Sequence, residues 1–187
     1  MNFDFLLRNA PLPVKVLAGG FLLSLSLAYV YALGNIALVI GWTPRAIAVH
    51  YYGAEEVIRV EAAPTGEQSL DLDAAPTEKP AAVLGPRPSF KNLVQEGHFH
   101  LFGMTSFFFA LTFLGLFTAV PLKWKTLMVG TPYVAIVFDN LSFMATRFWG
   151  PQFSYLTAIS GAFMGLSFSA LWLAVALEII KKSEVSK

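Results

Sequence analysis

The chain contains four long runs of apolar positions, separated by shorter polar or charged segments. They extend over about Val14–Ile40, Phe99–Val120, Thr126–Ala145 and Tyr155–Ile180. A bilayer core about 30 Å thick requires roughly 20 apolar residues in a helix, and each run reaches that length. The first run exceeds the apolar core of a signal peptide, which spans about 7 to 15 residues. The pattern therefore predicts four membrane-spanning helices, of which the first is a retained anchor.

Short turns join the second, third and fourth runs, so these spans should be neighbours in space. We expect an all-α integral membrane protein built as a four-transmembrane-helix antiparallel bundle. Residues 1–41 form the N-terminal segment and the first span, and residues 42–98 form a loop outside the membrane. Residues 99–187 form the remaining spans and a C-terminal tail.

The positions of lysine and arginine predict the orientation of the bundle. They precede the first span, occupy the turn between the second and third, and follow the fourth: Arg8, Lys15, Lys123, Lys125, Lys181, Lys182 and Lys187. The loop at 42–98 instead carries eight acidic and five basic residues. Because positive charge near span ends favours the cytoplasmic side, both termini should be cytoplasmic. The loop should then face the periplasm, with the chain in a bacterial inner membrane.

The loop begins with the signals of a short helix over 44–52. Thr43 is a suitable N-terminal cap, Pro44 fits the first helical position, and Gly53 is a suitable stop. Residues 56–61 alternate in a way that favours a small strand, although one strand alone has no pairing partner. Residues 62–88 are rich in Ala, Pro, Thr, Glu and Asp, as in a flexible linker.

The segment between this linker and the second span has a helical start of its own. Ser89 is a suitable cap for residues 90–97. These residues can continue as helix into the second span.

Composition supports the membrane assignment and excludes several classes of function. Hydrophobic residues make up 56% of the chain and charged residues 13%, against about a quarter charged in soluble domains. A net charge of +1 provides no concentrated basic field, which excludes nucleic acid as a partner. The absence of cysteine excludes disulfides, iron–sulfur clusters, thiolate zinc sites and c-type haem attachment. Phosphate-binding glycine loops, HExxH and nucleophile elbows are also missing, which indicates a subunit that is not an enzyme by itself.

All three histidines, His50, His98 and His100, fall at the predicted outer end of the bundle. Residues two apart on a helix point about 200° apart. His98 and His100 would therefore bind one ion together only if the backbone were extended, which Gly97 permits. We take His100 and His50 as the preferred metal ligands, with His98 as a substitute.

A second pattern places further candidate ligands beside His100. Glu96, His100 and Met104 are four residues apart and share one helix face. Carboxylate, imidazole and thioether groups can bind copper, iron or haem iron. Glu96 is thus an additional candidate metal ligand, and Met104 a candidate cofactor ligand. An interfacial histidine is more often a solvated or hydrogen-bonded anchor than a ligand, and Met104 alone would be a core residue.

Asp139 is the acidic residue that lies well inside the third span. A carboxylate at depth costs at least about 2.5 kcal/mol unless it is paired or protonated. Asp139 lies eight residues before Arg147, about 12 Å along a helix, and so near the level of His100. It is a candidate ligand, acceptor for an imidazole N–H, or proton carrier. The alternative is a structural interhelical hydrogen bond or an ion pair with Arg147.

These features lead to three functional hypotheses. The first is a small inner-membrane subunit with a His-based haem, copper or iron site at the outer face, serving electron transfer or metal handling. The second is a structural or assembly subunit without a cofactor. The third is a quinone-interacting protein in which His100 and Asp139 bind the head group. A small-residue face at Gly161, Gly165 and Ser169 would serve packing within the bundle or contact with other membrane subunits.

Overall fold

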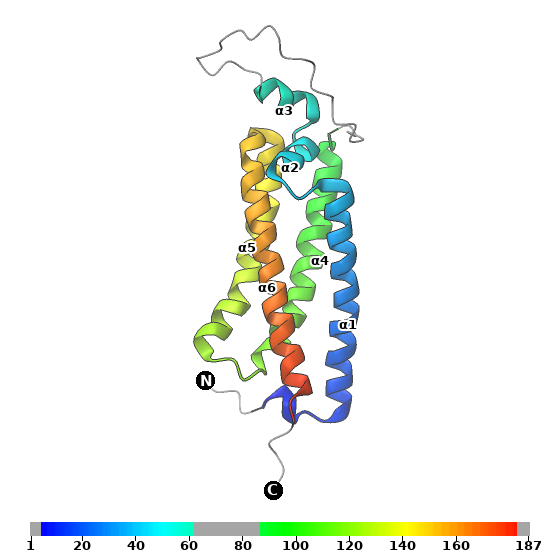
Figure 1. Cartoon of the computed structure of the whole chain (residues 1–187), viewed down its shortest axis with the longest axis vertical. Helices are drawn as coiled ribbons and strands as arrows, with labels where there is room; N and C mark the ends of the chain where they lie inside the picture. The colour runs from blue at the N-terminus through cyan, green and yellow to red at the C-terminus, as the bar shows by residue number, and fades with distance from the viewer. Residues whose placement is uncertain (1–4, 62–86, 183–187) are drawn as a thin grey trace, which may run out of the picture.

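The computed structural model describes residues 5–61 and 87–182, whose regular elements are all helical. Four long helices run along the long axis of the molecule (Figure 1): α1 (Leu12–Asn35), α4 (Phe90–Leu116), α5 (Leu122–Trp149) and α6 (Ser154–Ile180). Two short helices, α2 (Pro44–Tyr51) and α3 (Ala54–Glu61), lie at one end. The described parts of the two terminal segments lie at the other end. Three single-turn elements complete the chain: η1 (Leu7–Asn9), η2 (Ile36–Ile40) and η3 (Pro151–Phe153).

The predicted four-helix antiparallel membrane bundle is confirmed. All four long helices have the length and the apolar composition needed to cross a bilayer. The second span begins earlier than its apolar run because Ser89 accepts a hydrogen bond from the Asn92 N–H and starts α4 at Phe90. Residues 90–97 are thus continuous with the second span, as expected.

The predicted helix at 44–52 is confirmed as α2. The Thr43 hydroxyl accepts a hydrogen bond from the Ala46 N–H at 3.1 Å, and Gly53 turns the chain with φ of +113°. Most of the predicted linker at 62–88, residues 62–86, lies outside the described residues.

The predicted strand at 56–61 is wrong, because these residues belong to helix α3. A helix forms its hydrogen bonds internally, whereas a lone strand would leave its backbone groups without partners. Helix α3 buries Val57 and places charged side chains toward solvent, with ion pairs Arg45–Glu61 and Arg87–Glu56. The short alternating pattern is therefore one face of a helix.

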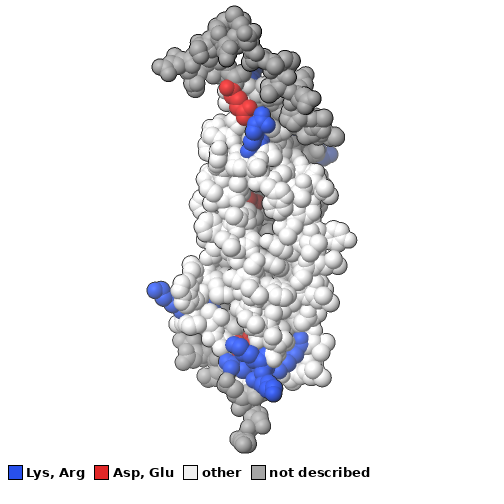
Figure 2. Space-filling model, in the orientation of Figure 1, with Lys and Arg blue, Asp and Glu red and all other residues white. Residues whose placement is uncertain are grey.

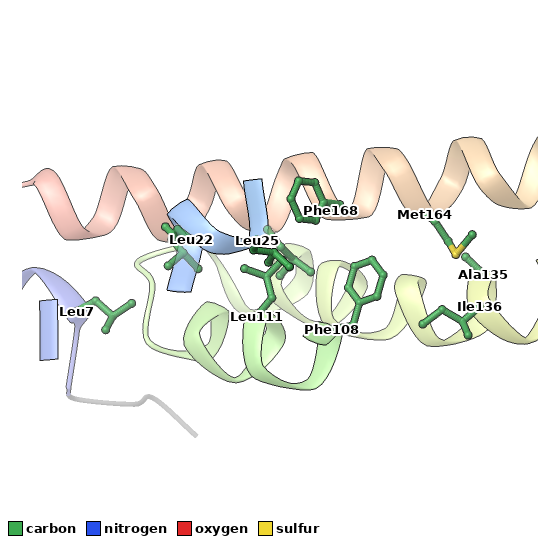
Figure 3. Packing of buried hydrophobic residues seen from close by; sticks show 11 residues of the cluster. Leu7, Leu22, Leu25, Phe108, Leu111, Ala135, Ile136, Met164 and Phe168 are labelled. Atoms are coloured by element: carbon green, nitrogen blue, oxygen red, sulfur yellow. The ribbon is translucent and has the colours of Figure 1, made fainter. Parts of the chain in front are cut away.

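The main hydrophobic core runs along the inside of the bundle and draws on η1 and all four spans (Figure 3). Its buried members are Leu7, Leu22, Leu25, Phe108, Leu111, Ala135, Ile136, Met164, Phe168, Leu171 and Val175. A second, smaller cluster holds α2 against the end of the bundle: Ile47, Tyr51, Leu93 and Phe143. The fold therefore fixes α2 by packing on α4, α5 and α6.

The outside of the bundle is apolar. Only 17–33% of the most hydrophobic window of each span is buried, so most of each span faces outward. Figure 2 shows lysine and arginine gathered toward the end with the termini, charges of both signs near α2 and α3, and a nearly uncharged belt between them. We refer to the two ends as the lysine-rich end and the α2/α3 end. The belt is the surface that contacts lipid.

Helix α1 packs more sparsely than the other spans, and its buried residues are Ala18, Leu22 and Leu25. Its Tyr29 ring stacks on Phe168 of α6 with centroids 4.2 Å apart. A Cβ atom at Gly165 would lie 2.9 Å from the Tyr29 hydroxyl. Gly165 therefore provides the space in which α1 approaches α6, so this part of the predicted partner face serves packing within the bundle.

A buried carboxylate closes the lysine-rich end. Glu178 is 2% exposed and accepts hydrogen bonds from Arg8 Nε at 2.8 Å and from the Ala119 N–H at 3.1 Å. The Leu7 N–H also donates to the Phe117 carbonyl at 2.9 Å. The N-terminal segment is thus tied to α6 and to the residues after α4. Unlike Asp139, Glu178 does not stand out in the sequence, because it lies at the end of its span beside Lys181 and Lys182.

The first turns of α5 diverge from α6 toward the lysine-rich end (Figure 1). None of residues 122–131 is buried, whereas Pro132 is. Proline lacks an N–H and its ring crowds the preceding turn, which bends a helix. Pro132 thus separates the packed part of α5, which carries Asp139, from a first part that contains no buried residue.

Glu178→Ala should lower the free energy of unfolding by about 3–5 kcal/mol, because it breaks a buried ion pair and removes the acceptor of a backbone N–H. Denaturant or thermal unfolding of the purified protein in mild detergent measures this loss. Glu61→Ala is the control, since its ion pair with Arg45 is half-exposed and its loss should leave stability nearly unchanged. Similar losses in both variants would contradict the importance of the buried pair.

Candidate functional site

Five side chains form a polar cluster in the half of the bundle nearer α2 and α3. They are Tyr51 of α2, Glu96 and His100 of α4, Asp139 of α5 and Ser160 of α6. Helix α4 is continuous through Gly97, so Glu96 and His100 lie one turn apart on one face. A Cβ atom at Gly97 would lie 3.4 Å from both the Asn140 Oδ1 and the Phe143 ring. The close approach of α5 to α4 at this glycine brings His100 to Asp139.

Asp139 links three helices. Its Oδ1 accepts a hydrogen bond from the Ser160 hydroxyl at 2.8 Å, and its Oδ2 lies 3.1 Å from His100 Nε2. The latter contact is within ion-pair distance but lacks the geometry of a directed hydrogen bond. Among the described residues, the buried His100 Nε2 has no hydrogen-bond partner. The site thus combines a buried carboxylate with an imidazole nitrogen whose hydrogen-bonding capacity is not used within the described chain.

The Tyr51–Glu96 pair lies next to this site, toward the α2/α3 end. The Tyr51 hydroxyl donates a hydrogen bond to Glu96 Oε1 at 2.9 Å, and the Tyr51 ring stacks on Phe143 with centroids 5.4 Å apart. Burial, followed by the nearby carboxylates of Glu96 and Asp139, raises the pKa of Tyr51 well above its ordinary value. Tyr51 is therefore a neutral phenol whose pKa is affected by both carboxylates.

His50 borders the cluster on the α2 side. Its ring meets the Tyr51 ring edge-on with centroids 4.7 Å apart. Burial lowers the pKa of His50 below its usual value, and the carboxylate of Glu96 opposes this shift in part. The structure favours a neutral His50 imidazole.

His98 lies on the outer surface of α4, away from the cluster. Its side chain is exposed, and its ring stacks with Phe102 at 6.1 Å. The backbone at Gly97 is helical, so the extended conformation that would let His98 and His100 share an ion does not occur. Met104 is partly buried and packs against the main core.

Arg147 is not the partner of Asp139. Its Nε donates to the Pro88 carbonyl at 3.3 Å and its guanidinium lies over the Phe148 ring. Asn140, which follows Asp139, donates to the Ile136 carbonyl within its own helix. Asp139 instead accepts a hydrogen bond from Ser160 and lies beside His100, so the structure contains the interhelical hydrogen bond expected as an alternative but not the ion pair with Arg147.

The donor set does not fit a multidentate metal site. No three histidine, aspartate or glutamate side chains among residues 5–61 and 87–182 converge as metal ligands. Three of the candidate ligands lie in one cluster: Glu96, His100 and Asp139. Glu96, however, accepts a hydrogen bond from Tyr51, and His98 faces away from the cluster.

Two members of the cluster, Tyr51 and Ser160, were not predicted from the sequence. Tyr51 follows His50 at the end of the predicted helix, where a tyrosine next to a membrane surface often has a polar partner. Ser160 lies beside the small-residue positions of the fourth span, and it faces Asp139 across the helix interface. A search for hydroxyl groups at the depth of Asp139 would have found Ser160.

Lowering the pH should destabilise the protein through His50. Because burial depresses the pKa of this group in the folded state, the unfolded chain binds the proton more readily. The corresponding stability is complete above the ordinary histidine pKa of about 6.5 and is lost as the pH falls through the lower folded pKa. Thermal unfolding between about pH 8 and pH 5 should show a smaller loss in His50→Gln than in the wild type. His98→Gln, at an exposed position, is the control, and an unchanged profile in His50→Gln would contradict this role.

Comparison with known proteins matches the chain to the family Aq_1264_TM, a transmembrane helical domain. The match covers residues 41–186, which include α2 to α6 and all five residues of the polar cluster, and leave α1 outside. No curated protein and no solved structure matches the chain. Since the match covers more than three quarters of the sequence, the chain belongs to the Aq_1264_TM family of transmembrane helical domains.

Proposed function

We propose that this integral membrane protein binds the head group of a lipid-soluble quinone at the His100–Asp139 pair, as a subunit of an electron-transfer complex. The observation that supports this most is the His100 imidazole. Its Nε2 lies 3.1 Å from a buried carboxylate yet has no hydrogen-bond partner among the described residues. Since this nitrogen faces the carboxylate, which orients the ring, a quinone carbonyl oxygen would bind the other ring nitrogen, on the part of the imidazole that is exposed.

The position of His100 suits a ligand that arrives through the bilayer. Its side chain is 35% exposed although it lies on a membrane-spanning helix. The neighbouring Phe99 is exposed on the same helix and offers an aromatic face for a ring. A hydrophobic ligand would reach His100 sideways from the lipid, without crossing the protein.

The distribution of charge supports an orientation for this site. Lysine and arginine gather at the end that carries the termini (Figure 2), and this end should face the cytoplasm. The polar cluster would then lie in the outer half of a bacterial inner membrane, with α2 and α3 in the periplasm.

A structural or assembly role is the second candidate, and one observation favours it. Asp139 already receives the Ser160 hydroxyl of the neighbouring helix, which is the kind of hydrogen bond that joins helices in membranes. In this case His100 and Asp139 would hold α4, α5 and α6 together, and the protein would contribute to a complex through its exposed helix faces. Ser169 and Gly161 lie on one such face, where a Cβ atom at Gly161 would meet no atom within 4 Å.

A quinone-binding measurement tests the first proposal. The protein in detergent or nanodiscs is titrated with short-chain ubiquinone and menaquinone analogues, and binding is followed by tryptophan fluorescence. His100→Ala should weaken binding by about two- to tenfold, since a hydrogen bond contributes about 0.5–1.5 kcal/mol. His98→Ala is a matched control on the same helix and should bind as the wild type does, because His98 faces away from Asp139.

The same preparation tests the other hypotheses. A haem would give a Soret band, and a copper or iron ion would appear in stoichiometric amounts on elemental analysis. Either signal, lost in His100→Ala, would replace the quinone proposal by a haem or metal site. Folded protein that binds none of these and purifies with other membrane subunits would favour the structural role.

A further inference from the structure

We propose that Glu96 transfers protons between water at the α2/α3 end and the His100–Asp139 pair, and that Tyr51 is the positioning residue that holds Glu96 in place. The inference rests on the proposed function in that it concerns the same site. It names the source of the protons for that site and requires no quinone.

The location of His100 requires a side chain that transfers protons between water and the imidazole. His100 lies on a helix long and apolar enough to span a membrane, and in the proposed site its exposed part would face lipid, where the hydrocarbon supplies no water. Its buried Nε2 faces Asp139, which is itself buried among α4, α5 and α6. Protons must therefore reach the pair along the protein.

Glu96 is the titratable group placed for this task. It is half-buried and lies one turn from His100 on the same face of α4, about 6 Å closer to the α2/α3 end. A protonated Glu96 carboxyl would pass its proton to an imidazole nitrogen of His100. The carboxylate is thereby regenerated and takes up another proton from water, and no other bond changes.

Tyr51 fixes the carboxyl group in this position. Its hydroxyl donates to Glu96 Oε1 at 2.9 Å, and its ring is 4% exposed and stacked on Phe143. Because burial and the two carboxylates raise the pKa of Tyr51, the phenol keeps its own proton and remains a donor. The second oxygen of Glu96 is then available for exchange.

The charged and titratable groups around Glu96 agree with this role. Helix α2 contributes Tyr51 and His50. Both side chains are at least partly buried, and both interact electrostatically with the Glu96 carboxylate. From α4 comes His100 and, across the bundle on α5, Asp139. Helix α6 contributes the neutral Ser160 hydroxyl to Asp139. Glu96 thus lies between His50 of α2 and the His100–Asp139 pair.

Proton exchange at individual histidines tests the proposal in the full chain. The chain has only three histidines, so ¹⁵N-histidine labelling in nanodiscs gives three imidazole signals, which His50→Gln, His98→Ala and His100→Ala assign. The exchange rate of the His100 ring N–H with water is then measured by NMR. Glu96→Gln should slow this exchange by about tenfold or more, as expected when a positioned acid–base group is removed.

Controls separate proton transfer from a merely structural effect. The exposed His98 in the same sample should exchange at its wild-type rate, and Glu61→Gln, at an exposed carboxylate, should leave all three rates unchanged. Glu96→Asp should restore part of the His100 rate, and Tyr51→Phe should slow it less than Glu96→Gln does. Loosened packing would instead admit water and speed up exchange, so an unchanged or faster His100 rate in Glu96→Gln would overturn the proposal.

The outcome also separates this inference from the quinone proposal. If the wild type binds no quinone but Glu96→Gln slows His100 exchange, the proton route holds and the quinone proposal fails. If quinone binds at His100 but Glu96→Gln leaves the exchange rate unchanged, the quinone proposal holds and the proton route fails.

Discussion

The pairing of Asp139 is the constraint on which this half of the bundle depends. A carboxyl group at this depth is costly unless it has partners, and water is absent from the bilayer core. Its two oxygens are met by Ser160 of α6 and His100 of α4, so one side chain sets the register of three helices. The close contact at Gly97 lies beside this pairing, since a Cβ atom there would already touch the Asn140 and Phe143 side chains of α5.

Helix α2 links this internal pairing to the α2/α3 end of the bundle. It is a short element beyond the membrane spans, yet its Tyr51 enters the bundle and contacts Glu96 and Phe143. The hydrophobic cluster around Ile47 and Leu93 holds it there. The family match begins at residue 41, just before α2, so α2 belongs to the same matched unit as the polar cluster, whereas α1 does not.

The features that could be predicted well from the sequence are those set by local rules. Span length and hydropathy indicated four helices, and the caps at Thr43 and Ser89 indicated two helix starts. The strand predicted from the alternation at 56–61 was wrong, because a pattern of six residues is too short to distinguish a strand from one face of a helix. Helical spacing showed that His98 and His100 point apart, but which of them faces Asp139 depends on packing between helices. Tyr51 meets Glu96 across 45 residues and Arg8 meets Glu178 across 170, and single-sequence periodicity carries no information about such pairs.

The contact between Arg8 and Glu178 joins nearly the two ends of the chain. During synthesis, α1 emerges long before α6 exists, and its few buried residues give it little to pack against in the meantime. Helix α1 must therefore remain in the bilayer as a largely independent helix until α6 is inserted. Completion of the lysine-rich end is thus a late event in assembly, which only a chain translated through Glu178 can reach.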